Sequence, residues 1–287
     1  MTRTDSEYRR AVAATRVAVA LSIACVARSA TVGAQQVSLR IEPPVGETLR
    51  MRLDQRVEMS GTTRMGAGDS TATVVTTLLV ISRTFVERRD RDASILLTST
   101  DSVAASSSGA DSLTVATETR RAMQGKRVRL RIAPDGATEV VDGGADGSAE
   151  LNALFAQMPA TLPNSTVEVG ARWSRVMMAP LGATGDAKNA GKLQATFRLD
   201  SLSRNGERAY VSLVGILSRP PSSKDGWATM TMSGSMTGGL VVDRRRGWIN
   251  DARMTYIVRS VVTPNSGSTA DAMRVRMKVT QWVRAVP

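Results

Sequence analysis

This 287-residue chain contains few side chains that could act as catalytic nucleophiles or as their bases. The sequence holds no histidine and a single cysteine, Cys25. A serine nucleophile would therefore lack an imidazole base, and no G-x-S-x-G turn is present to expose one. None of the five lysines follows a serine or threonine by three positions, so the spacing of a Ser–Lys dyad is also missing. These residue types exclude histidine-based triads and leave one cysteine, near the N-terminus, for thiol chemistry.

Carboxylate pairs are the remaining route to hydrolysis, because two acids can serve as acid and base at a glycosidic bond. The densest acidic clusters are Asp90 with Asp92, and Asp142 with Asp146 and Glu150. The first falls in an expected hairpin turn, where Asp is common for backbone reasons. The second could hold calcium or precede a helix, although its spacing does not match an EF-hand loop. A secreted carboxylate-dependent hydrolase is the alternative function, and we assign no catalytic residue.

The 14 methionines are the other chemically distinctive set. Several occupy alternating positions of expected strands, which places them on one face of a sheet. Thioethers bind Cu(I), but without histidine or cysteine nearby they are better explained as core filler or as the lining of an apolar cavity. We expect no metal and no cofactor. The expected lining of an apolar ligand site is Met51, Met59, Met230, Met232 and Met254.

Basic residues dominate the charge, since 38 Lys and Arg against 26 Asp and Glu give a net charge of +12. Outward-facing rows on such strands keep a sheet hydrated and discourage edge pairing, or they meet an anionic surface. Nucleic-acid binding usually adds stacking aromatics, which are sparse here. We expect a lipid or protein partner of the envelope, or an anionic surface, and no nucleic acid. The two rows are Arg127, Arg129 and Arg131, and Arg274, Arg276 and Lys278.

The elements that must position these residues are strands. From Leu49 to Met59 apolar and charged residues alternate, and the same period recurs over 127–132, 193–199 and 273–279. A period of two is typical of a strand with one buried and one hydrated face. Turn dipeptides such as Asn205-Gly206 separate the runs, which favours antiparallel pairing. The pattern predicts about eleven strands.

Two segments have the period of a helix instead. Residues 148–158 place apolar side chains three and four positions apart, begin after a capping serine, Ser148, and end at Pro159. Residues 111–123 show a weaker form of the same pattern, with Gly125 available to end the helix. We therefore expect a short helix at each place.

The two halves of the chain are similar to one another. Residues 86–97 align without a gap on residues 202–213, and the flanking segments recur in the same order. The alternative is that any two hairpins look alike. We predict a first β-unit at 35–147, a helical connector at 148–166 and a second β-unit with a closing strand at 167–287.

The first 34 residues have the features of a secretory signal peptide. Basic residues precede an apolar run at 17–27, which is too short to span a bilayer as a helix. Small residues favour cleavage after Ala34, or alternatively after Ala30. In a second alternative the chain is a lipoprotein anchored at Cys25, and in a third it carries a twin-arginine export signal. We expect export to the periplasm or the cell exterior.

Three short motifs carry a resemblance to known proteins: VGARW at 169–173, the Asp135-Gly136 turn, and the turn at 243–247 before Trp248. The chain resembles uncharacterised secreted β-rich proteins of GC-rich bacterial genomes over most of its length. The resemblance implies an exported β-protein and transfers no site residue. A long curved sheet crossed by a helix is also similar, in architecture alone, to bacterial lipoprotein-carrier half-barrels.

These patterns predict an all-β, antiparallel fold with minor α content. Two similar units would form a curved half-barrel or a sandwich, with the helix near 148–158 over one opening. The expected function is a non-catalytic exported cell-envelope protein with a binding or scaffolding role, holding a lipid or other apolar ligand between sheet and helix. The alternatives are the hydrolase and an outer-membrane β-barrel, which the arginine-rich faces oppose because one face of a barrel must meet lipid.

Overall fold

The computed structural model describes residues 36–65, 68–108, 112–142, 160–178, 191–222, 228–264 and 272–286. The expected signal peptide at 1–34 and the helix expected at 148–158 lie outside the described residues. Cys25, Asp146 and Glu150 lie outside them as well. The structure therefore tests the expected strands and the helix expected at 111–123.

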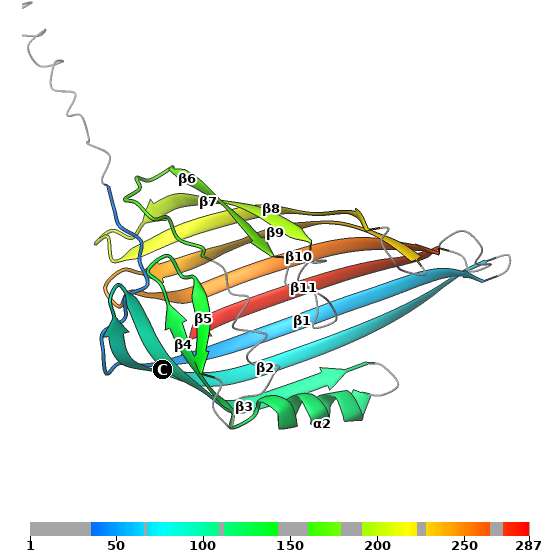
Figure 1. The fold of residues 1–287 in the computed structure, drawn as a ribbon, viewed down its shortest axis with the longest axis horizontal. Helices are drawn as coiled ribbons and strands as arrows, with labels where there is room; N and C mark the ends of the chain where they lie inside the picture. The colour runs from blue at the N-terminus through cyan, green and yellow to red at the C-terminus, as the bar shows by residue number, and fades with distance from the viewer. Residues whose placement is uncertain are drawn as a thin grey trace, which may run out of the picture. The chain divides into compact units, whose positions relative to one another are not determined.

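Eleven strands form one antiparallel sheet, as the alternating pattern predicts (Figure 1). The all-β class is confirmed, and of the two expected arrangements the described strands adopt the single curved sheet. The strands are β1 (Thr48–Met65), β2 (Gly68–Asp90), β3 (Ala93–Ser107), β4 (Arg127–Ile132), β5 (Thr138–Asp142), β6 (Arg172–Met178), β7 (Lys192–Leu202), β8 (Arg208–Ser222), β9 (Ala228–Asp243), β10 (Trp248–Pro264) and β11 (Met273–Ala285).

The sheet order is β5-β4-β3-β2-β1-β11-β10-β9-β8-β7-β6. Two meanders of consecutive strands, β1–β5 and β6–β10, thus lie on either side of β11, which pairs with both β1 and β10. β5 and β6 are the two edges and do not pair with each other, so the sheet is not closed. Every pair of neighbouring strands in this sheet is consecutive in the chain except β1 with β11.

The two meanders begin with the same backbone contact. The N–H of Gly46, before β1, donates to the carbonyl of Val86 at 2.9 Å, and the N–H of Gly170, before β6, donates to the carbonyl of Leu199 at 2.7 Å. Both glycines have positive φ, 85° and 91°, which a side chain would disfavour. The division into two related units stays a prediction. The shared contact before the first strand of each meander is consistent with it.

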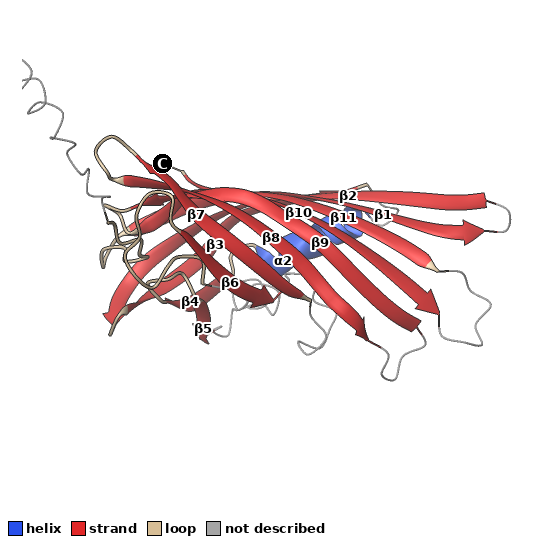
Figure 2. Ribbon diagram, turned by 90° about the horizontal axis from the view of Figure 1, so that it is seen from above, coloured by secondary structure: helices blue, strands red, loops and turns tan. Residues whose placement is uncertain are grey.

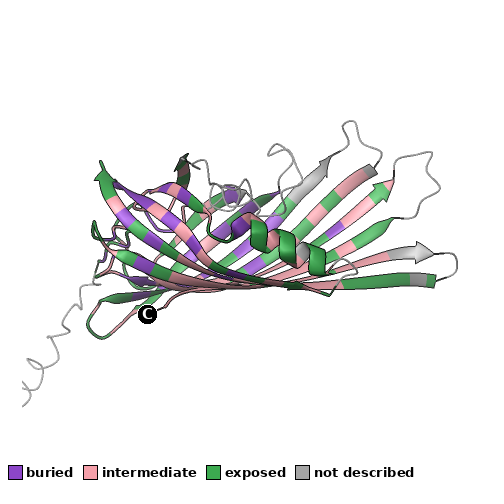
Figure 3. Cartoon of the chain, turned by 90° about the horizontal axis from the view of Figure 1, so that it is seen from below, coloured by how far each residue is buried: buried purple, intermediate pink, exposed green. Residues whose placement is uncertain are grey.

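One face of the sheet carries the helix α2 (Ser112–Met123), at the place where the weaker helical pattern predicts one. α2 packs through Met123 on Val80 of β2 and Val103 of β3, and Gly125, with a φ of 73°, follows its end. We call this face the inner face and the opposite face the outer face. Figure 3 shows α2 in front of the strands, and Figure 2, from the other side, shows it behind them.

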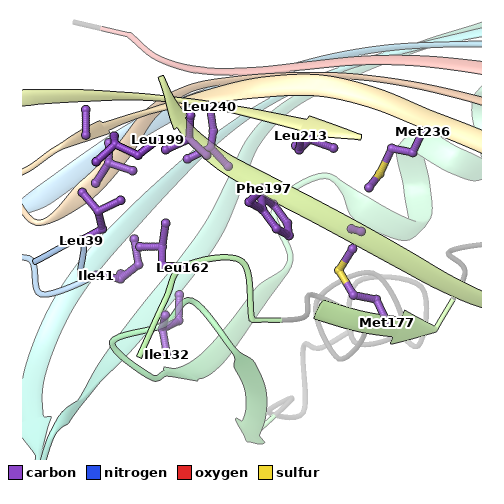
Figure 4. Close-up of a cluster of buried hydrophobic side chains, with 14 of the residues drawn as sticks. Leu39, Ile41, Ile132, Leu162, Met177, Phe197, Leu199, Leu213, Met236 and Leu240 are labelled. Carbon is purple, nitrogen blue, oxygen red and sulfur yellow. The ribbon is translucent and has the colours of Figure 1, made fainter. Parts of the chain in front are cut away.

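The main core lies on the inner face near the hairpin turns that join β2 to β3, β4 to β5, β7 to β8 and β9 to β10. We call this the near end of the sheet. Two non-strand segments, 36–43 and 160–167, cover it. The N–H groups of Val37 and Val167 each donate to the carbonyl of the other residue. Leu39, Ile41 and Leu162 are buried there against Leu199 and Leu240 (Figure 4). The chain's own side chains therefore fill the near end.

Glycines in β9 permit the close approach of its neighbour. A Cβ on Gly238 would overlap the carbonyl oxygen of Arg253 and lie 3.1 Å from the Cα of Met254, both in β10. A Cβ on Gly234 would meet the backbone of β10 in the same way. Glycine in a strand commonly marks such a bend or close approach. These two positions therefore allow β9 and β10 to pack as a coiled, curved pair.

Candidate functional site

The five methionines predicted to line an apolar site all lie on the inner face. The strand register decides this, because residues directly opposite one another share a face. Met59 of β1 lies opposite Met277 of β11, which lies opposite Val258 of β10. By the same ladders the inner face holds Met51 on β1, Met254 on β10, and Met230 and Met232 on β9.

The inner face is apolar and uncharged along the middle of five adjacent strands. On β1, β11, β10 and β9, and on β2 as far as Val86, the described residues whose side chains point inward include no Asp, Glu, Lys or Arg. Beyond the bulge at Glu87, Arg89 turns inward and contacts Glu42 of the covering segment at 3.5 Å. The inward polar groups there are amides and hydroxyls, such as Gln55, Gln281 and Tyr256. The charged side chains along the middle of these strands therefore project from the outer face.

Burial on the inner face falls from the near end toward β1 and β11. Phe197 of β7 and Leu213 of β8 are buried, whereas Met59 on β1 is 45% exposed. The chain thus covers the inner face at β7 and β8 and leaves it partly open at β1. We call the following half-buried or exposed residues of β1, β2, β10 and β11 the open inner surface: Leu53, Val57, Met59, Leu78, Met254, Met277 and Val279.

The hydroxyl of Tyr256 lies within this apolar region. The Tyr256 hydroxyl contacts the Met254 sulfur at 3.3 Å, and burial raises the pKa of the phenol above its usual range. A phenol with a raised pKa stays neutral and remains a hydrogen-bond donor at physiological pH. The Tyr256 hydroxyl, like the amides of Gln55 and Gln281, can therefore offer a neutral donor to a polar head of an otherwise apolar molecule.

Several acidic residues in the part of the chain that the structure describes are paired with arginine. Asp90 and Asp92 flank a hairpin turn, as expected, and contact Arg131 at 3.7 and 3.9 Å. The Arg52 guanidinium bonds to Asp54 and holds the pKa of that carboxyl below its usual range, while Arg56 does the same for Glu58. A general acid at neutral pH needs a raised carboxyl pKa, so these lowered values do not suit that role. No group of three His, Cys, Asp or Glu side chains able to hold a metal ion occurs among the described residues.

Trp282 of β11 makes a contact on the outer face that the sequence patterns did not indicate. The guanidinium carbons of Arg253 and Arg284 lie 4.2 and 3.9 Å from the centre of its ring. Its indole N–H donates to Asp251 at 2.7 Å. Two cation–π contacts and a hydrogen bond fix this indole, so it is a structural clamp between β10 and β11. Arg284 follows Trp282 by two positions on β11, but Arg253 and Asp251 come from β10, and no spacing signal along the chain predicts that they meet the ring.

The alternation of arginine with acid on the outer face does not suit contact with acyl chains. Arg52 pairs with Asp54 at 2.7 Å and Arg56 with Glu58 at 2.8 Å, so β1 presents charges at successive outward positions. Charged side chains on a lipid-facing strand are destabilising. The outer-membrane alternative is therefore not favoured.

The comparisons with known proteins leave the function to be argued from the site. No family model and no curated protein matches the chain. Among solved structures, it is similar to an outer membrane channel from Pseudomonas putida F1, at 11% identity and a TM-score of 0.23, over 85% of this chain and 97% of that chain. A similarity this distant defines no class. In the described residues, no helix has both the length and the apolar character needed to cross a membrane.

Proposed function

We propose that this protein is a non-catalytic exported envelope protein that holds a lipid, or another elongated apolar ligand, against the inner face of its curved sheet. The observation that carries the proposal is the open inner surface, which is apolar, free of charged side chains among its described strands, and only partly covered. Two of its residues, Leu53 and Leu78, pack against the cluster of Val80, Val103 and Met123, so a ligand there would reach the C-terminal end of α2.

The near end of the same sheet shows what the inner face is like when the chain covers it. There Leu39, Ile41 and Leu162 are almost completely buried, and the sheet residues beneath them are buried too. Each fully buried aliphatic side chain contributes about 1.5–3 kcal/mol to the free energy of unfolding. Leaving comparable side chains exposed next to that core forgoes this stabilisation. Neighbouring apolar side chains that the chain leaves partly open commonly mark a binding site.

The dimensions and the side chains suit an elongated ligand. Leu53 and Met59 are six residues apart on β1, a length of about 20 Å along the strand. The methionines contribute flexible, polarisable side chains that adapt to ligands of different shape. An acyl chain laid along β1 and β11 would contact the open inner surface over most of its length.

Native mass spectrometry of the mature protein, purified from a bacterial envelope without detergent, tests the proposal. A reproducible extra mass that is lost on denaturation and is identified as a lipid would support it. A single mass equal to that of the chain alone, in protein that also fails to bind an added fatty acid, would overturn it. The same spectrum reports the N-terminal processing, and so tests cleavage after Ala34 against lipidation at Cys25.

A pair of matched variants locates the ligand. Met59→Glu places a charge on the open inner surface, whereas Val214→Glu places one on the outer face of β8, where Val214 is 58% exposed. Burying an unpaired carboxylate against an acyl chain is costly, so Met59→Glu should weaken the binding of a fluorescent fatty acid at least roughly tenfold. Val214→Glu should leave the affinity unchanged. Equal losses in the two variants would contradict the assignment of the inner face.

A further inference from the structure

Most arginines on the outer face have an acidic neighbour. Arg83 pairs with Asp101 at 2.8 Å across β2 and β3, and Arg253 approaches Asp251 at 3.6 Å. Two members of the basic row on β4 are compensated as well. Arg129 pairs with Glu87 at 2.8 Å, and Arg131 lies near the two aspartates of the β2–β3 turn. Positive charge is therefore locally balanced over these parts of the sheet.

The second expected row behaves differently. Arg274, Arg276 and Lys278 of β11 project from the outer face, and Arg276 lies opposite Arg259 of β10. Among the described residues, none of these four cations makes an ion pair. On the other side of β11, Lys278 lies opposite Glu58 of β1. With Arg56, which pairs with Glu58, the group forms what we call the cationic surface: Arg56, Arg259, Arg274, Arg276 and Lys278.

The carboxylate of Glu58, which lies among these five cations, is affected by their charge. A hydrogen bond from Arg56 and the charges of Lys278 and Arg276 together hold the pKa of Glu58 below its usual range. Five cations against one carboxylate leave a net charge of +4 within three adjacent strands. Such a concentration of like charge is unfavourable unless counter-ions or an anionic partner compensate it.

Aliphatic side chains stand beside the cationic surface on the same face. Lys278 lies opposite Ile257 of β10, which lies opposite Ser235 of β9 and then Ile216 of β8. Ile216 is 71% exposed and its neighbour Val214 also projects into solvent. The outer face thus combines unpaired cations with protruding aliphatic groups, while the tryptophan on this face is already held between two guanidinium groups.

We propose that the cationic surface docks this protein on a membrane surface rich in anionic phospholipid. Arginine and lysine attract the phosphate groups, and exposed aliphatic side chains enter the boundary between headgroups and acyl chains. A nucleic acid would favour free aromatic rings for base stacking, and none projects from the cationic surface. The proposal is independent of the ligand on the inner face, since it concerns the opposite face of the sheet.

Sedimentation of the mature protein with lipid vesicles tests the proposal. Vesicles of phosphatidylcholine mixed with phosphatidylglycerol should bind the protein, vesicles of phosphatidylcholine alone should not, and salt should weaken the binding. Each cation near an anionic surface strengthens binding roughly fivefold. The triple variant Arg274→Ser, Arg276→Ser and Lys278→Ser should therefore lose on the order of a hundredfold in affinity.

The matched control removes the same charge elsewhere. Arg204, Arg208 and Arg245 are exposed and lie at or beside the turns of the near end. Their replacement by serine should change vesicle binding far less than the β11 variant does. Both variants should keep the wild-type unfolding midpoint, because all the replaced side chains are exposed or lack an ion-pair partner among the described residues.

Four outcomes would overturn the proposal. One is failure of the wild-type protein to bind the anionic vesicles, and another is an equal loss in both triple variants, which would indicate only a net-charge effect. The third is tight binding of DNA in a competition that removes the protein from the vesicles, which would assign the cationic surface to nucleic acid. Binding of free phosphate alone, without vesicle association, would likewise overturn it.

Discussion

Leu39→Ala tests whether the segment at 36–43 is an integral part of the sheet's core. Leu39 is 1% exposed and belongs to the same buried cluster as Leu199 and Leu240. The segment is tied down by backbone bonds at its two ends, from Val37 to Val167 at 2.8 Å and from Glu42 to Gly247 at 2.9 Å. Its removal from the near end would expose the core beneath it.

The magnitude follows from the burial. A leucine truncated to alanine at a fully buried site loses its transfer free energy and leaves a cavity, which together cost about 2–5 kcal/mol. If the segment instead detached locally, the loss would be capped by the small docking free energy. Ordering a residue costs about 1–2 kcal/mol and so offsets most of the burial gain of a short segment. Integral packing therefore predicts a loss above about 2 kcal/mol.

Urea unfolding of the mature protein, followed by tryptophan fluorescence, measures the effect. The midpoint should fall while the dependence on urea stays constant, since the surface exposed on unfolding hardly changes. The control is Val45→Ala in the adjoining stretch, where Val45 is 56% exposed and the change should stay within about 0.5 kcal/mol. If Leu39→Ala cost no more than Val45→Ala, the assignment of the segment to the core would be refuted.

Three more predictions concern the sheet itself. Gly238→Ala forces β9 away from β10 and should lower the free energy of unfolding in urea by about 1–3 kcal/mol or more, whereas Gly61→Ala, with open space around the new methyl group, should not. The bond from Arg52 lowers the folded-state pKa of Asp54, so its stabilisation is present above the ordinary pKa of 3.8 and is lost as pH falls below it. Asp54→Asn should therefore cost up to about 1 kcal/mol at neutral pH, and the difference from wild type should vanish in acid unfolding measurements. Trp282→Leu removes both cation–π contacts and should cost more than Trp282→Phe, which keeps a ring between the two guanidinium groups, when the two are compared by thermal unfolding.

Strand number and antiparallel pairing could be predicted because both are local properties. Alternation along 49–59 and 273–279 reflects the two faces of a strand, and turn residues fix which strands become neighbours. For the same reason the five methionines could be assigned to one face. The alternation could not show how deeply each would be buried, and Met59 is substantially exposed although its parity matches that of buried Leu49.

The remaining features depend on contacts between distant segments. The central place of β11, the cover at 36–43 and the clamp around Trp282 join residues far apart in sequence, for which no short-range period exists. The difference between the two basic rows has the same origin. Both rows have the same alternating pattern of cations in the sequence. In the structure Arg129 pairs with Glu87 of β2, whereas Arg276 lies opposite another cation, Arg259 of β10.

The sequence by itself determined the strands, their antiparallel order within each meander, and the separation of apolar from charged side chains, because the period of two is written along each strand. Only the tertiary structure decided which part of the apolar face the chain covers and which cations stay uncompensated. Burial and charge pairing depend on what lies across neighbouring strands and above the sheet, and those neighbours are set by long-range packing.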